Sequence, residues 1–197
     1  MSDLIALLAL SMPLSYSPGP GNGYFAAVGA RFGAMRSLPA NLGYHAAGFL
    51  LMIAFGLMFD GMARLSPELL TALRYAGSAY ILWLAWKLAT ANVSTIETTN
   101  PSGQFLDGVV LLLLNPKAYL IVGVIFSQFL NPADDYRVWR VMWISAVFIL
   151  NNMIAFHLWA LAGSAIAAWF RERHHLRILN GGLGAMLASV GVWMLFA

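Results

Sequence analysis

Residues 105–130 read FLDGVVLLLLNPKAYLIVGVIFSQFL. A helix needs about 20 mostly apolar residues to cross the hydrocarbon core of a bilayer, so this stretch is long and apolar enough to span a membrane. Asn115, Pro116 and Lys117 interrupt its middle. Because proline lacks a backbone N–H and clashes with the preceding helical turn, the stretch is predicted to be a transmembrane helix that breaks near its centre.

Apolar runs of similar length occupy most of the remaining chain. The 197 residues are 60% hydrophobic and 10% charged, with a mean hydropathy of +0.74, whereas a soluble domain has about 25% charged residues. We therefore predict an all-α, polytopic membrane protein. Its transmembrane helices, about six in number by length and hydropathy, are expected at residues 4–28, 38–59, 69–89, 105–130, 139–169 and 176–196.

The polar segments between these runs are short, so residues 1–197 are interpreted as a single transmembrane domain. Residues 91–103 have the Ser, Thr, Asn, Pro and Gly content of a linker. They divide the chain into halves at roughly 1–90 and 104–197. Three helices in each half place the halves in opposite orientations across the membrane, which is the arrangement of an inverted repeat.

The first half carries its own break at residues 17–23 (SPGPGNG). Broken helices at matching positions of two halves point to a transporter's substrate site, because the N-terminus of a half-helix can receive a carboxylate. A simple proline kink in each helix is the alternative interpretation. The transport interpretation places these residues along the substrate pathway: Pro18, Gly19, Pro20, Asn22, Asn115, Pro116, Lys117 and Asn152.

Among these residues, Lys117 has the highest free-energy cost of membrane insertion, because a lysine at the centre of a membrane helix costs about 2.5–3.5 kcal/mol on insertion scales. No Asp or Glu lies centrally in any predicted span, which leaves a substrate, backbone carbonyls or Asn side chains as partners. In the functional interpretation, the ammonium attracts the carboxylate of an amino-acid substrate. In the alternative, the long side chain extends toward the membrane interface.

Two histidines, His45 and His157, lie within predicted spans. Either could carry a coupled proton, since imidazole titrates near neutrality, or could simply hydrogen-bond a neighbouring helix. Asn151 and Asn152 are adjacent on one helix, so at most one of them can face a pathway, and the other would hold helices together.

Loop charges indicate the orientation. The membrane face that receives Arg31 and Arg36 carries more Lys and Arg than the face that receives Arg137 and Arg140. Because cytoplasmic loops are enriched in basic residues, the first face is predicted to be cytoplasmic.

Several other classes of function are disfavoured. Cysteine is absent and the net charge of +3 is dispersed, so neither a metal site, a cofactor nor a nucleic-acid partner is expected. No motif supports an intramembrane enzyme. A purely structural membrane protein would need neither Lys117 nor paired breaks. The expected partners are a small amino acid and membrane lipid, and the Gly- and Ala-rich helix faces are compatible with a homodimer.

The motifs also resemble a known family. Residues 18–20 (PGP), 29–33 (GARFG) and 115–117 (NPK), together with Gly43, are similar to the LysE/RhtB family of amino-acid exporters. Residues 75–87 (YAGSAYILWLAWK) and 159–163 (WALAG) resemble its cysteine and O-acetylserine exporter branch. Many members carry an Asp where this chain has Asn152, which shifts attention for proton coupling to His157.

This resemblance implies a secondary transporter of the bacterial inner membrane that exports an amino acid or a close derivative from the cytoplasm, driven by the proton gradient. The branch similarity implies a small neutral substrate such as cysteine or O-acetylserine. Export of homoserine, threonine or homoserine lactone is the nearest alternative. Export of a basic amino acid is another, and the absence of a central Asp or Glu argues against it.

Overall fold

The computed structural model describes residues 2–58, 67–89, 103–130 and 136–168, together with residues 181, 182, 184, 185, 188, 189, 191, 192 and 195. This part of the chain is helical, as predicted. The expected linker, apart from residue 103, and much of the expected sixth span lie outside the described residues. In chain order the helices are α1 (Ser2–Tyr16), α2 (Pro20–Phe32), the 3-10 turn η1 (Ala34–Ser37), α3 (Leu38–Leu57), α5 (Pro67–Ala89), α6 (Phe105–Leu113), α7 (Pro116–Phe129) and α8 (Arg137–Ala168).

Both predicted helix breaks are present. Helix α1 ends at Tyr16 and α2 begins at Pro20, with Gly19 fully extended before it (φ −177°, ψ 178°). Helix α6 ends at Leu113 and α7 begins at Pro116, with a bend of 68° between the two helices. Proline is favoured at the first position of a helix because its missing N–H would have no intrahelical partner there. Each interrupted apolar run is therefore a pair of half-helices.

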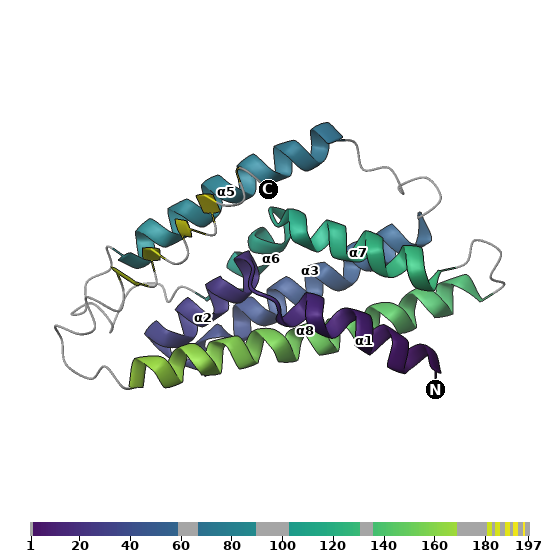
Figure 1. Ribbon diagram of the computed structural model, residues 1–197, viewed down its shortest axis with the longest axis horizontal. Coiled ribbons are helices and arrows are strands. Elements are labelled where there is room, and N and C mark those ends of the chain that lie inside the picture. Colours follow the sequence, from purple (N-terminus) through teal and green to yellow (C-terminus); the bar gives the residue numbers. More distant parts are fainter. Residues whose placement is uncertain are drawn as a thin grey trace.

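Two ends of the molecule can be defined from contacts between helix termini (Figure 1). At the end called here the Asp3 end, the Arg140 guanidinium on α8 lies 3.3 Å from the Asp3 carboxylate on α1. Its Nε donates to the Phe129 carbonyl at the end of α7 (2.9 Å). The start of α8 also meets the end of α3, where the Arg137 guanidinium donates to the Gly56 carbonyl (3.2 Å).

The opposite end is called the Arg36 end, after a residue of η1. There the Ser164 hydroxyl on α8 donates to the Gly29 carbonyl on α2 (2.8 Å). The Ala40 N–H on α3 donates to the Gly103 carbonyl just before α6 (2.9 Å). The broken helix α1–α2 therefore runs from the Asp3 end to the Arg36 end, and α6–α7 runs the opposite way. Helices α3 and α8 also run in opposite directions, and the inverted repeat itself stays a prediction.

Small residues allow the closest helix contacts at the Arg36 end. A Cβ added at Gly29 or at Gly163 would meet a backbone carbonyl of the facing helix, so α2 and α8 pack main chain against main chain. The same holds at Gly43 and Gly108 between α3 and α6. Such contacts are typical of membrane helices, where small residues allow close backbone approach.

The outer surface is that of a multi-pass membrane protein. Within the described residues, Ala34–Leu57 and Arg137–Ala168 are each long and apolar enough to cross a membrane, and the bent pair α6 and α7 makes a third if its two helices form one span. Large apolar side chains cover the outside, with Leu50 70% exposed and Leu150 62% exposed. Such side chains are stable against lipid, and they would be costly against water.

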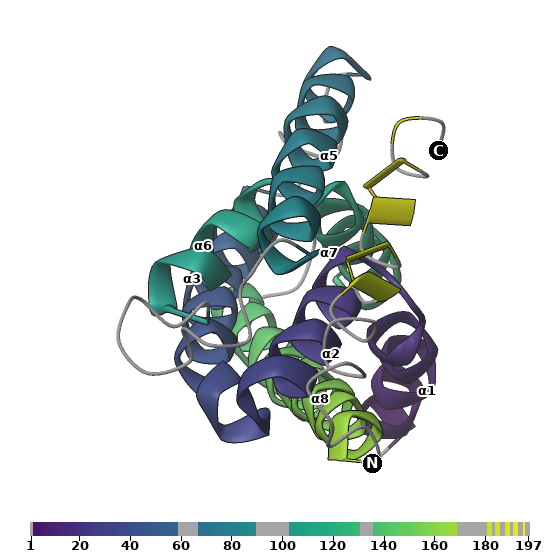
Figure 2. The same cartoon turned by 90° about the vertical axis from the view of Figure 1, so that its left-hand side faces the viewer.

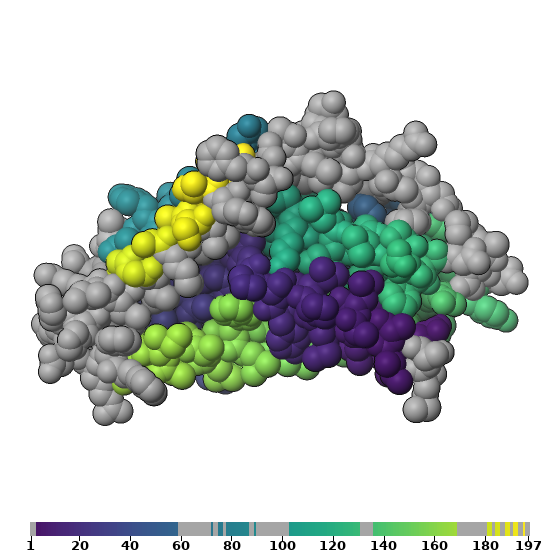
Figure 3. All heavy atoms as spheres, viewed as in Figure 1, coloured from purple at the N-terminus to yellow at the C-terminus, as the bar shows by residue number. Residues whose placement is uncertain are grey.

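Helix α5 lies at the periphery, beside the C-terminal residues (Figures 1 and 2). A Cβ at Gly184 would lie 2.8 Å from the Ala89 Cβ, and one at Gly191 would lie 3.0 Å from the Leu82 Cγ. In the space-filling view α1 and α7 lie side by side on the front face (Figure 3). The two broken helices thus meet near their breaks.

Candidate substrate site

A small cavity, with a water-accessible volume of about 30 Å³, lies where the two breaks meet. Its walls come from α1, α2, α3, α6, α7 and α8, and most of its side chains are apolar. The lining extends from the breaks toward the Asp3 end. The polar side chains that line it are those of Ser15, Asn22, Tyr44, Asn115, Lys117 and Asn152. Four residues of the predicted pathway are therefore brought together here.

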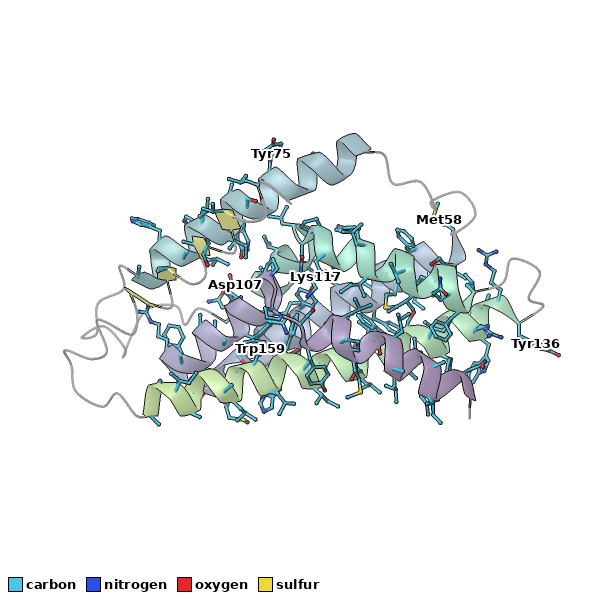
Figure 4. All side chains as sticks on the ribbon, in the orientation of Figure 1. Met58, Tyr75, Asp107, Lys117, Tyr136 and Trp159 are labelled. Atoms are coloured by element: carbon cyan, nitrogen blue, oxygen red, sulfur yellow. The ribbon has the colours of Figure 1, made fainter. Side chains whose placement is uncertain are left out.

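Lys117 lies near the centre of the molecule, and its ammonium is turned toward the end of α1 (Figure 4). The Nζ donates to the Ser17 carbonyl at 3.1 Å, to the Ser17 hydroxyl at 2.9 Å and to the Pro18 carbonyl at 3.4 Å. These groups follow the last residue of α1, where the helix dipole leaves partial negative charge. The side chain is half-buried, and its ammonium is held by oxygens of the first break.

The other carbonyls at the end of α1 also have protein donors. The Asn22 side-chain amide on α2 donates to the Ser15 carbonyl (2.9 Å), and the Trp159 indole on α8 donates to the Tyr16 carbonyl (3.3 Å). Unsatisfied backbone groups in hydrocarbon cost several kcal/mol each by transfer arguments, about 2–7 depending on the reference state. The break is thus stabilised by side chains from neighbouring elements, and Asn22 has a structural partner as well as a place in the cavity wall.

Asn115 fixes the second break. Its side-chain oxygen accepts the Lys117 backbone N–H (3.1 Å), which caps the first turn of α7. Its amide donates to the Tyr44 hydroxyl on α3 (3.0 Å). The cavity lining does not include the prolines or Gly19. Their contribution is to end the helices, and Gly19 leaves room for the lysine, since a Cβ there would lie 3.0 Å from its Nζ.

His45 and Asn152 form a buried pair beside the cavity. The His45 Nδ1 lies 2.8 Å from the Asn41 carbonyl, and its Nε2 lies 3.0 Å from the Asn152 side-chain amide nitrogen. A carbonyl can only accept, so Nδ1 carries the proton and Nε2 accepts from the amide. The neutral imidazole is therefore held in one defined tautomer.

The two remaining intramembrane candidates point elsewhere. His157 does not line the cavity, and its Nδ1 has no hydrogen-bond partner within the part of the chain that the structure describes. Asn151 is turned toward α1, where its amide lies 3.4 Å from the Ser11 hydroxyl and 3.3 Å from the Ser15 hydroxyl. Of the adjacent asparagines only Asn152 faces the cavity, in keeping with the expectation that at most one could.

An aromatic cluster closes the cavity on the side of the Arg36 end. The Phe156 ring lies 4.6 Å from Phe25, 4.8 Å from Tyr44 and 5.2 Å from His45, measured between ring centroids. Phe25 is fully buried. Beyond this cluster α2 and α8 are in main-chain contact, and the cavity lining does not extend past it toward the Arg36 end.

Sequence reasoning missed three members of this site. Ser17 supplies two of the lysine's acceptors, Tyr44 supports Asn115, and Phe156 closes the floor. Ser17 is the first residue of the break motif and Tyr44 directly precedes His45. Their closeness in sequence to polar residues of the predicted site was therefore the one feature that could have identified them. Phe156 gave none, because an aromatic residue in a membrane helix is not distinctive.

The chemistry of the cavity is that of a binding site for an anionic group. Lys117 supplies a positive charge, and none of the described lining residues is Asp or Glu. The described residues also contain no cluster of three His, Cys, Asp or Glu that could hold a metal. A mostly apolar cavity with a few polar groups, located between broken and oppositely directed membrane helices, is typical of a secondary transporter.

The family profile described as "LysE type translocator" matches residues 12–197. The chain therefore belongs to the LysE-type translocators, and it is a multi-pass protein of the bacterial inner membrane.

Curated relatives match over nearly the whole chain. A homoserine/homoserine lactone efflux protein of Salmonella typhimurium is 28% identical, with 94% of this chain and 92% of the relative covered. A cysteine/O-acetylserine efflux protein of Salmonella paratyphi A is 29% identical, with 96% and 95% covered. A membrane protein of Pseudomonas aeruginosa is 27% identical over 89% of this chain and 86% of the relative. No solved structure matches the chain.

Proposed function

We propose that this translocator exports a small neutral amino acid, of the type of cysteine or O-acetylserine, from the cytoplasm in exchange for protons. The observation that carries the proposal is the Lys117 ammonium in the wall of a cavity whose described lining residues include no acidic side chain. Such a cavity attracts a carboxylate and repels a substrate with net positive charge. Export of a basic amino acid is therefore disfavoured.

A second substrate class is favoured by the relative named for homoserine and homoserine lactone efflux. A lactone has no carboxylate, so it could not use Lys117 as a carboxylate partner. Homoserine itself could. We therefore place free amino acids ahead of the lactone, and a lactone-specific transporter would be indifferent to the charge of Lys117.

For the coupled proton we propose His45 ahead of His157. His45 is buried and hydrogen-bonded to Asn152, which lines the cavity, so its protonation would alter the cavity wall directly. His157 has no such connection among the described residues.

A homodimer also stays a prediction. Among the described residues, no atom lies within 4 Å of a Cβ built at Gly181 or at Gly123, which leaves both positions open for close contact.

The test is transport in inverted membrane vesicles under an imposed pH gradient. Labelled cysteine, O-acetylserine, serine, homoserine, threonine, homoserine lactone and lysine are compared in vesicles with and without the protein. The proposal predicts gradient-dependent accumulation of the small neutral amino acids, with lysine excluded. Accumulation of lysine or of the lactone alone would contradict the substrate class, and accumulation that ignores the gradient would contradict proton coupling.

A further inference from the structure

The three oxygens that hold Lys117 form a site for a primary ammonium. Two carbonyls and one hydroxyl, all from Ser17 and Pro18, lie 2.9–3.4 Å from the Nζ. They are located directly after the end of α1, where the helix dipole adds negative potential. A compact ammonium with three donors matches this set of acceptors.

The dipole of α7 favours a Lys117 ammonium that lies away from the start of that helix. The residue follows Pro116 in the first turn of α7, and a cation at a helix N-terminus is disfavoured by the dipole. Its ammonium therefore extends away from its own helix to the carboxyl end of α1. Any other cation that reached the same oxygens would release it.

The first break also offers complementary positions for a zwitterion. Helix α1 ends there with partial negative charge, and α2 begins four residues later, at Pro20, with partial positive charge. Gly21 and Asn22, in the first turn of α2, line the cavity. An amino acid placed across the break would direct its ammonium to α1 and its carboxylate to the start of α2.

We infer that the Ser17 and Pro18 oxygens are the subsite for the substrate's α-ammonium, and that Lys117 occupies this subsite until a substrate displaces it. The released lysine then pairs with the substrate's carboxylate, so one ammonium replaces another and no unpaired charge is left in the membrane. The inference rests on the proposed function, since it assigns the second charged group of the same substrate. Ser17 and Pro18 are not part of the cavity lining, but Lys117, which lines the cavity, contacts them, so the subsite adjoins a cavity whose described lining has no Asp or Glu.

The direct test uses Lys117→Met, which vacates the subsite. Binding of labelled methylammonium, which has no carboxylate, is measured on purified protein in detergent. We expect Lys117→Met to bind it about tenfold or more tightly than the wild type, because the tethered competitor is gone. Adding Ser17→Ala to Lys117→Met should reverse part of the gain, because it removes one of the three oxygens and leaves the two carbonyls. Arg36→Met, which removes a cation at the Arg36 end, should give no gain.

Equal methylammonium binding by the wild type and a correctly folded Lys117→Met would overturn the subsite. A second measurement needs no variant: serine and glycerate, which differ only in ammonium against hydroxyl, compete with O-acetylserine transport by the wild type. Serine should inhibit about tenfold or more strongly, and equal inhibition would also overturn the subsite. If methylammonium binds Lys117→Met as expected but the wild type transports no amino acid, the proposed function fails and the subsite stands.

Discussion

At the residue scale, Asn152 controls the state of His45. In the neutral imidazole the Nε2 accepts a hydrogen bond from the Asn152 amide nitrogen. A second proton on Nε2 would turn this acceptor into a donor, so the amide would have to rotate and present its oxygen. The Tyr44 ring, 5.2 Å from His45, contacts the same imidazole and connects through its hydroxyl to Asn115. Protonation of His45 would therefore affect both Asn152 and, through Tyr44, Asn115, and both asparagines line the cavity.

The first prediction follows from this pair. His45→Gln should remove pH-driven accumulation of substrate in proteoliposomes and leave exchange of labelled for unlabelled substrate, because the glutamine can hydrogen-bond but cannot titrate. His157→Gln is the matched control, and we expect it to keep both activities. Full gradient-driven accumulation by His45→Gln, or its loss in His157→Gln, would reassign the coupled proton.

Residue types were readable from the sequence, whereas their partners were not. Lys117 and Asn115 were recognised because polar residues within an apolar run are costly. The partner of Lys117 lies one hundred positions away in the chain, and no local pattern gives such a pairing. His157 follows Phe156 directly, and a rotation of about 100° per residue places it off the cavity face. That rotation is set by packing against α2, which a single sequence does not specify.

At the element scale, the helix breaks were predicted and the packing around them was not. Two prolines and their neighbours determine where α2 and α7 begin, since proline's effect on a helix is local. The main-chain contact of α2 with α8 depends instead on Gly29, which faces Ala160, and on Gly163, which faces Ala26, and these glycines are 134 residues apart in the chain. Small residues are common in membrane helices, so their presence alone did not identify this contact.

Gly163→Val tests that contact. A branched side chain there would collide with the Ala26 main chain, so α2 and α8 must separate, and overpacking of this kind costs about 1–3 kcal/mol or more. We expect a clearly lower midpoint of thermal unfolding in detergent. Gly123→Val is the control, because nothing lies within 4 Å of a Cβ at that position. Equal stability of the two variants would show that the contact is not tight.

At the scale of the whole molecule, the cavity lies to one side of the aromatic cluster. Its lining extends from the breaks toward the Asp3 end, while aromatic rings and the α2–α8 main-chain contact lie between it and the Arg36 end. Loop charges predict that the Arg36 end is cytoplasmic. The structure would then be the outward-facing state of an alternating-access cycle, in which the two oppositely directed broken helices rock about the site.

Because the chain contains no cysteine, single cysteines can test this state directly. Ile121→Cys, in the cavity wall, should react in intact cells with a membrane-impermeant maleimide. Val28→Cys, which is 3% exposed and lies behind the aromatic cluster, should not. Labelling of Val28→Cys alone would indicate the opposite orientation or the opposite state.

The central claim is that the Lys117 ammonium, held at the meeting of two broken helices, binds the carboxylate of the transported amino acid. The most direct measurement is efflux by Lys117→Met in cells, beside its abundance in the membrane. Loss of a buried charge should leave insertion unchanged or improved, and efflux should fall to the level of cells without the protein, while Arg36→Met retains it. Efflux by Lys117→Met at the wild-type rate would contradict the claim.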